Sequence, residues 1–130
     1  MEDAVYDSDE NMLYIEHAYA VQNYFTFFIR VKSGDFCGAS TFCISGKDLI
    51  SAIEQLSEIN CRLDGNCTLK DTESDDYIRF IFDKFGHVNV SGKNGGVTSD
   101  NFVVFSFVAD QTIITNIIDY FKRVLKQSQP

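Results

Sequence analysis

The segment NYFTFFIRVK, residues 23–32, alternates its side chains between two unlike faces. One face is wholly apolar and consists of Phe25, Phe27, Ile29 and Val31. The other face is mixed and consists of Tyr24, Thr26, Phe28 and Arg30. A repeat of two residues is typical of a β-strand with one face against a core, so this segment predicts a strand.

Apolar segments on both sides of this strand predict further strands. Residues 12–21 (MLYIEHAYAV) precede it, and residues 36–44 (FCGASTFCI) follow it after the turn SGD. Gly38 indicates a bulge or a close backbone approach, because glycine has no Cβ. Residues 1–11 are polar and carry five carboxylates, which predicts a flexible acidic tail. The expected single domain therefore spans residues 12–127.

Two later segments change to the period of a helix. Residues 45–59, SGKDLISAIEQLSEI, have an apolar stripe made of Leu49, Ile50, Ile53 and Leu56. Residues 110–127, DQTIITNIIDYFKRVLKQ, have a broader apolar stripe that follows Asp110. Asp110 is a suitable N-cap, because its carboxylate can accept hydrogen bonds from free backbone N–H groups.

Four more strands complete the predicted fold. They span residues 67–71, 77–85, 87–92 and 101–109. The last is almost continuously apolar, which predicts a strand buried on both faces. We therefore expect an α+β fold in which seven mostly antiparallel strands form curled sheets covered by two helices, in the order βββα-ββββα. The junctions 42–53 and 106–117 align without a gap, which indicates either a weak internal repeat or two helices with the same packing requirement.

The composition limits the classes of function. The chain has 19 acidic and 11 basic residues, a net charge of −8, which attracts cationic proteins and disfavours direct binding of nucleic acid. The N-terminal residues MEDAVYDSDE lack the basic and apolar segments of a signal peptide. No apolar run approaches the ~20 residues of a membrane-spanning helix. We expect a cytoplasmic protein that does not contact the membrane.

Few residues suit catalysis or metal binding. The cysteines have a C-x5-C spacing, which is not a usual zinc spacing, and they are expected to be reduced and buried: Cys37, Cys43, Cys61 and Cys67. His87, four residues after Asp83, is the best candidate for acid–base chemistry. A catalytic histidine needs an oriented partner and a pocket, so a structural role in a turn is favoured. We predict that the protein is not an enzyme and that it has no catalytic residue, no metal and no cofactor.

The acidic segment DTESDD, residues 71–76, is the best candidate binding site. Its composition suits a solvated turn between two strands, and its density of carboxylates also suits a cationic partner. The predicted contact residues are Asp71, Glu73, Asp75 and Asp76.

Two other functions compete with this interpretation. Tyr24 and Phe28 share one face of a strand and could stack on bases, as in a sheet-based nucleic-acid or regulatory binding module. The basic residues argue against it, because they are scattered singly: Arg30, Lys32, Lys70, Arg79 and Lys84. The third possibility is a small acid–base enzyme centred on His87.

Several segments carry a resemblance to a known family. They are GDFCG (34–38), KDLISAIEQL (47–56), LDG (63–65), FDKFGHVNVSG (82–92) and NFVVFSFVADQTIITNII (101–118). In this order and spacing they resemble the WapI-like immunity proteins, over about residues 12–125. The chain departs from the family's pattern in having no Trp, and its acidic N-terminal residues lie outside the shared region.

The resemblance implies a small cytosolic antidote to the toxic domain of a wall-associated or contact-dependent inhibition toxin. Its partner would be the C-terminal domain of one cognate toxin, usually a nuclease, bound tightly by a non-enzymatic inhibitor. A nuclease carries a basic cleft for its substrate, and an acidic inhibitor can occupy that cleft. The acidic segment lies outside the shared motifs, where a partner-specific contact is expected.

Overall fold

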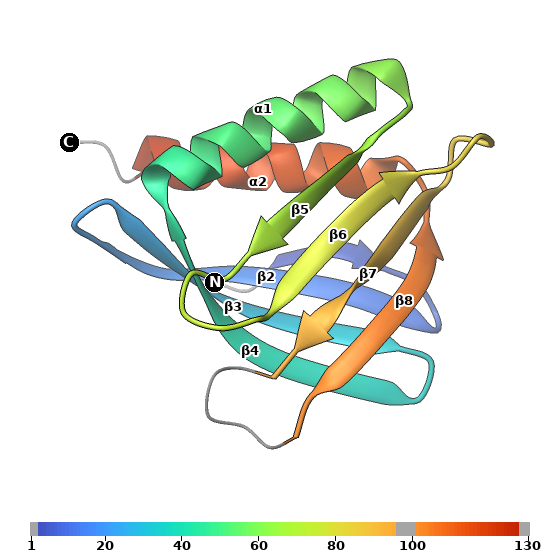
Figure 1. Cartoon of the computed structure of the whole chain (residues 1–130), viewed down its shortest axis with the longest axis horizontal. Helices are drawn as coiled ribbons and strands as arrows, with labels where there is room; N and C mark the ends of the chain where they lie inside the picture. Colours follow the sequence, from blue (N-terminus) through green and yellow to red (C-terminus); the bar gives the residue numbers. More distant parts are fainter. Residues whose placement is uncertain (1–2, 96–100, 128–130) are drawn as a thin grey trace.

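A computed structural model describes residues 3–95 and 101–127 of the chain. Within these residues the chain forms eight strands and two helices, and two successive halves each have four strands followed by one helix (Figure 1). The first half comprises β1 (Asp3–Asp7), β2 (Asn11–Val21), β3 (Tyr24–Ser33), β4 (Phe36–Ser45) and α1 (Gly46–Arg62). The second half comprises β5 (Asn66–Lys70), β6 (Tyr77–Phe82), β7 (Val88–Asn94), β8 (Val103–Ala109) and α2 (Thr112–Gln127).

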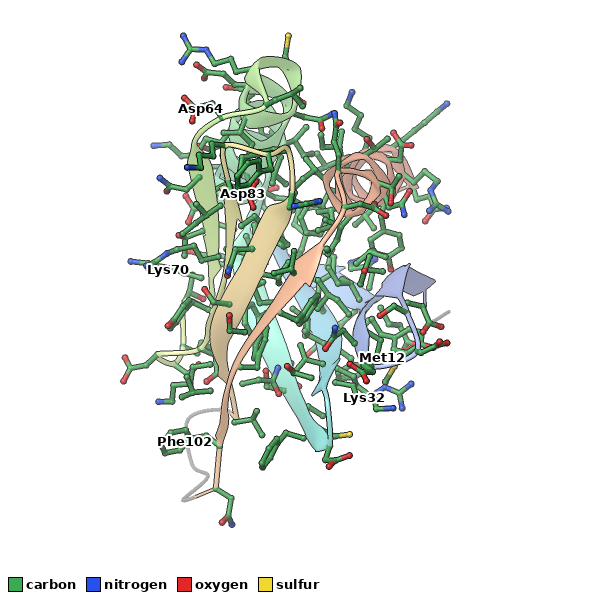
Figure 2. All side chains as sticks on the ribbon, turned by 90° about the vertical axis from the view of Figure 1, so that its right-hand side faces the viewer. Met12, Lys32, Asp64, Lys70, Asp83 and Phe102 are labelled. Atoms are coloured by element: carbon green, nitrogen blue, oxygen red, sulfur yellow. The ribbon has the colours of Figure 1, made fainter. Side chains whose placement is uncertain are left out.

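Each half folds its strands into one antiparallel sheet, in which neighbours in space are neighbours in the chain. The first sheet has the order β1-β2-β3-β4 and the second has the order β5-β6-β7-β8. Figure 2 shows the two helices end-on along one side of the molecule, with the sheets extending away from them. The edge strand β4 approaches the second sheet at Gly38, where an added Cβ would lie 3.0 Å from Asn94 Oδ1 and 3.3 Å from the Val103 side chain. The close approach predicted at Gly38 is confirmed.

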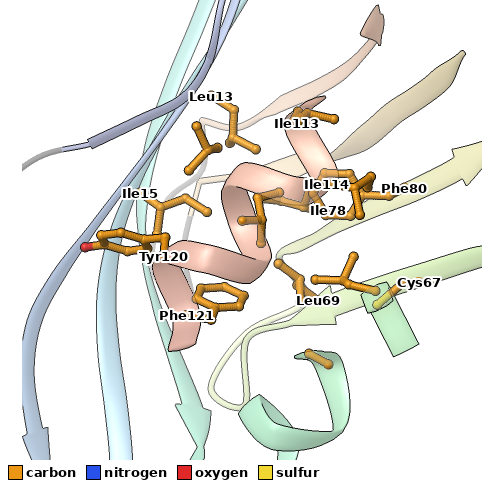
Figure 3. Packing of buried hydrophobic residues seen from close by; sticks show 14 of the residues in the cluster. Leu13, Ile15, Cys67, Leu69, Ile78, Phe80, Ile113, Ile114, Tyr120 and Phe121 are labelled. Atoms are coloured by element: carbon orange, nitrogen blue, oxygen red, sulfur yellow. The ribbon is translucent and has the colours of Figure 1, made fainter. Parts of the chain in front are cut away.

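Helix α2 packs its apolar face between the two sheets. Its buried residues are Ile113, Ile114, Ile117, Ile118, Tyr120, Phe121 and Val124. Figure 3 shows the helix with Leu13 and Ile15 of β2 on one side and Phe80 of β6 on the other. The ring of Phe121 lies 5.4 Å from that of Phe27 on β3. Burial of each large apolar side chain contributes about 1.5–3 kcal/mol, so this helix holds the sheets together.

The α+β class, the two helices and the antiparallel pairing are confirmed, but the strand count is wrong. The additional strand is β1, which lies in the segment expected to be a flexible acidic tail. It pairs with β2, Val5 is 2% exposed, and the carbonyl of Val5 accepts a hydrogen bond of 3.0 Å from the Asn116 side chain. Five carboxylates among residues 1–11 give this segment a polar composition, which conceals a strand that buries Val5.

Two further expectations about the sheets are wrong. The sheets are not strongly curled, because the two helices fill the open side between them and the strands need not close around the core. Strand β8 is not buried on both faces. It is an edge strand whose residues alternate, with Phe105 and Phe107 buried and Val104 and Val108 exposed.

The burial of Val5 predicts that β1 contributes to stability. The change Val5→Ala removes buried methyl groups and should lower the free energy of unfolding by about 1–3 kcal/mol. Asp7→Ala, on the same strand but exposed, should change it by less than about 0.5 kcal/mol. Urea unfolding of both variants measures these values, and equal effects would show that β1 does not pack as described.

Candidate functional site

The acidic segment connects β5 to β6 and is only partly exposed. Asp71 is 7% exposed and Asp76 is 1% exposed, whereas Glu73 and Asp75 are exposed. Of the four predicted contact residues, two therefore face solvent and two are enclosed by the protein.

The carboxylate of Asp71 organises the loop. Its Oδ1 accepts hydrogen bonds from the backbone N–H groups of Cys43, at 2.9 Å, and Glu73, at 3.2 Å. Its Oδ2 accepts a hydrogen bond of 2.6 Å from the Ser74 hydroxyl. The Asp71 backbone N–H donates to the carbonyl of Asp76 at 3.1 Å and closes the loop. Three donors offset the cost of burying the Asp71 carboxylate.

Asp76 connects the same loop to the end of β7. Its Oδ2 accepts a hydrogen bond of 3.0 Å from the backbone N–H of Gly95. Its own backbone N–H donates to the Ser74 hydroxyl at 3.1 Å. The two buried aspartates thus hold the loop in place, and Glu73 and Asp75 are left exposed to solvent.

The loop also covers part of the free edge of the first sheet. Strand β4 is an edge strand, and Cys43 lies within it. Thr72 donates two hydrogen bonds to the carbonyl of Cys43, one from its backbone N–H and one from its hydroxyl, each of 3.0 Å. Since the N–H of Cys43 donates to Asp71, both backbone groups of Cys43 are paired with the loop. Such pairing protects an edge strand from joining the sheet of another chain.

A groove lies between this loop and the tip of the β2–β3 hairpin, on the outer face of the first sheet. It consists of two adjoining hollows of about 370 and 470 Å³ that share Tyr19, Thr26, Cys43 and Glu73. Figure 1 shows the hairpin extending past the rest of the first sheet, on the side where the β5–β6 loop turns. Among the described residues, the lining includes carboxylates but neither lysine nor arginine.

The hairpin tip is held in a fixed conformation. Gln22 and Asn23 have φ angles of 50° and 66°, which suit the two-residue turns that match the twist of a hairpin. The carbonyl of Asn23 accepts a hydrogen bond of 2.7 Å from the backbone N–H of Gly46, the first residue of α1. A Cβ at Gly46 would lie within 3 Å of the end of the Asn23 side chain, so glycine lets this side chain pack against the start of α1.

Tyr19 reaches the groove because β2 contains a bulge. The pairing with β3 shifts between His17 and Tyr19, so that His17 pairs with Phe27 on the core side and Tyr19 pairs with Thr26 on the outer side. The hydroxyl of Tyr120 accepts a hydrogen bond of 2.7 Å from the His17 backbone N–H at this point. A strict alternation would place Tyr19 inside with His17, so the sequence pattern alone did not identify it.

His17 itself is a partly buried residue of the core side. Its imidazole lies 5.4 Å from the ring of Phe27 and 5.7 Å from that of Phe25. Burial lowers the pKa of His17, and a backbone hydrogen bond with Tyr19 opposes this effect only in part. These contacts indicate a packing role in the bulge.

The proposed acid–base pair lies on the exposed turn between β6 and β7. Asp83 Oδ1 accepts hydrogen bonds from the backbone N–H groups of Phe85, at 2.7 Å, and His87, at 3.0 Å. His87 Nδ1 lies 3.7 Å from Asp83 Oδ2. Desolvation raises the pKa of Asp83, but these hydrogen bonds and the nearby His87 lower it by a larger amount. The pKa of Asp83 therefore lies below its usual value. The geometry fits a turn anchor.

The cysteines do not assemble into a metal site. Among the described residues, no group of three or more His, Cys, Asp or Glu side chains is placed to hold a metal ion. All four thiols are free, and burial raises the pKa of Cys67 to about 11. The expectation that every cysteine is buried is wrong for Cys37, on the edge strand β4, and for Cys61, near the end of α1, which are exposed.

Basic residues gather on the outer face of the second sheet, contrary to the expectation that they are scattered. Lys70 and Lys93 both pair with Tyr77, and Arg79 lies two residues further along β6 on the same face. Figure 2 shows Lys70 pointing outward from this sheet. The Arg79 guanidinium lies 5.4 Å from the centre of the Tyr77 ring, and the Lys93 ammonium lies 4.7 Å from that of Phe102.

In the part of the chain that the structure describes, neither helix is long and apolar enough to cross a membrane.

The hydrogen bonds of Asp71 predict that it stabilises the protein while Glu73 does not. Asp71→Ala leaves buried donors without an acceptor and should lower the free energy of unfolding by about 2–3 kcal/mol. Glu73→Ala, two residues away and exposed, should change it by less than about 0.5 kcal/mol. Chemical denaturation compares the two variants, and a stable Asp71→Ala protein would contradict the anchoring role.

The exposure of the thiols predicts their order of reaction with an aromatic disulfide reagent. Cys37 and Cys61 should react quickly in the folded protein, and Cys67 should react only after unfolding, because the thiolate is the reactive species. Single cysteine-to-serine variants assign each phase. Rapid reaction of Cys67 in the folded protein would show that its surroundings are more open than described.

Sequence comparison places this architecture in a known family. A family model described as the immunity protein WapI-like family matches residues 6–128, nearly the whole chain. Comparison with curated proteins finds no match. The match spans both sheets, both helices and the groove, and it confirms the resemblance carried by the sequence motifs. The chain belongs to the WapI-like immunity protein family.

Proposed function

We propose that this immunity protein acts in the cytoplasm by binding the C-terminal domain of a cognate contact-dependent inhibition toxin. The toxin domain would be a cationic nuclease, and the immunity protein would block its basic active-site cleft. Membership of an immunity protein family is consistent with neutralisation of a toxin. The nuclease class of the toxin is what the family resemblance implies, and the acidic charge of the chain agrees with it.

The observation that carries the proposal is the exposed acidic loop of a strongly acidic chain. The net charge is −8, and Glu73 and Asp75 project from a loop that Asp71 and Asp76 hold rigid. A nuclease must attract a phosphate backbone, so its cleft is basic and also attracts an acidic protein. Complementary charge of this kind speeds association and fixes the orientation of the complex.

The experiment uses the toxin domain encoded beside this chain and measures cleavage of a labelled RNA. Wild-type protein should abolish cleavage and should prevent the toxin domain from binding a non-cleavable RNA analogue. The double variant Glu73→Gln/Asp75→Asn should associate roughly 3–10-fold more slowly at low salt, and the difference should shrink at high salt.

The matched control is Glu54→Gln/Asp119→Asn, which removes two exposed carboxylates from the outer sides of α1 and α2. At about 0.1 M ionic strength, where the Debye length is about 10 Å, it should leave the association rate within about twofold of wild type, because charges farther than this from the interface are largely screened. Occlusion of the cleft would be excluded if the toxin domain bound the RNA analogue and its inhibitor together. A toxin without activity on RNA or DNA would exclude the nuclease assignment.

The basic face of the second sheet raises one alternative function, a sheet-based nucleic-acid binding module, which the charge of the chain argues against. Lys70, Arg79 and Lys93 lie on one face with Tyr77, as described above. Their aromatic neighbours are already stacked with these cations, and the net charge of the chain repels phosphate. We therefore expect negligible affinity for RNA or DNA alone in a gel-shift or fluorescence anisotropy titration at physiological salt.

A further inference from the structure

The outer face of the first sheet carries large side chains that the described part of the chain leaves open. Val21 pairs with Tyr24 and Tyr19 pairs with Thr26 across β2 and β3, so the side chains lie together at the hairpin tip. Val21 is 61% exposed, Tyr24 50% and Tyr19 53%. Contiguous exposed apolar side chains mark interaction surfaces, and tyrosine is enriched among the residues that dominate binding.

The acidic loop supplies a carboxylate at the same place. Glu73 and Tyr19 line both hollows of the groove. The backbone N–H of Glu73 is bonded to Asp71, and the preceding Thr72 is bonded to Cys43 of β4. The backbone on both sides of the groove is therefore fixed before any partner arrives, which lowers the entropic cost of binding.

We propose that this groove is the docking site for an arginine side chain of the cognate toxin, which inserts between the tyrosine rings and Glu73. A guanidinium is attracted to the face of a tyrosine ring and forms strong hydrogen bonds with a carboxylate. The groove offers both groups side by side, and its described lining holds no cation that would repel a guanidinium. This inference rests on the proposed function for the identity of the partner.

Two other exposed aromatic residues, Phe85 and Phe102, do not offer the same chemistry. The rings of Phe85 and Phe102 already have lysines of the chain over them, Lys84 at 5.2 Å and Lys93 at 4.7 Å. Within the described residues, no lysine or arginine lies over Tyr19 or Tyr24. The tyrosine faces in the groove are therefore open to a cation, unlike the rings of Phe85 and Phe102.

The first test uses a tri-arginine peptide and follows the backbone amide resonances of the isotope-labelled protein. Resonances of Thr26, Cys43 and Glu73 should shift on titration, and a tri-glutamate peptide should shift none of them. Tyr24→Ala and Glu73→Gln should each remove most of the shift, whereas Phe85→Ala, at the exposed β6–β7 turn, should preserve it. Shifts that persist in both groove variants, or that are confined to the second sheet, would overturn the inference.

The second test measures the affinity of the neighbouring toxin domain for the same variants. Tyr24→Ala and Glu73→Gln should weaken binding roughly 10- to 30-fold, and Phe85→Ala should change it by less than about twofold. Melting curves confirm that each variant is folded, which is expected because Tyr24 and Glu73 are exposed. Unchanged affinity of both groove variants would overturn the docking site and leave the proposed function intact. If the wild-type protein does not bind the toxin, the proposed function fails. The peptide titration alone then tests whether the groove binds arginine.

Discussion

The hydrogen bond from the backbone N–H of Cys43 to the carboxylate of Asp71 joins the two halves of the chain at the open edge of β4. The same carboxylate holds the N–H of Glu73 and the hydroxyl of Ser74. One buried group therefore covers the sheet edge, shapes the acidic loop and sets one wall of the groove. The acidic segment combines a structural pair, Asp71 and Asp76, with an exposed pair that can meet a partner.

Side-chain periodicity predicted the regular elements well. The apolar face of residues 23–32 is the buried face of β3, and the open face carries Tyr24 and Phe28 as expected. The two helices begin and end within a few residues of their predicted bounds. These features depend on local patterns of apolar and polar residues. Such a pattern repeats with every turn of a helix and with every second residue of a strand.

Features that depend on one residue or on pairing between strands were not predictable in this way. Strand β1 has one valine in the core among carboxylates, and a bulge in β2 turns Tyr19 outward. Composition marked Asp71 and Asp76 as surface residues, because burial of a carboxylate depends on donors elsewhere in the chain, such as Cys43 and Gly95. The sequence therefore indicated the exposure of Glu73 and Asp75 but not the burial of Asp71 and Asp76.

The two outer faces of the molecule differ in a way that the net charge conceals. The groove end of the first sheet presents tyrosines beside Glu73, and Arg30 lies further along β3 over the ring of Tyr14. The second sheet presents Arg79 and Lys93 over its own aromatic rings. The cationic partner that we propose would be attracted to the groove end of the first face and repelled by the basic residues of the second. In the complex that we propose, this asymmetry would favour one orientation, because complementary charge sets the register of an interface.

Hydrogen–deuterium exchange of the protein with and without its toxin domain tests the docking surface most directly. The account predicts slower exchange on binding for the β2–β3 turn at Gln22 and Asn23 and for the loop residues Glu73 to Asp75. Exchange on β6 and at the β6–β7 turn should be unchanged. Protection confined to the second sheet, with the acidic loop exchanging as in the free protein, would contradict the account.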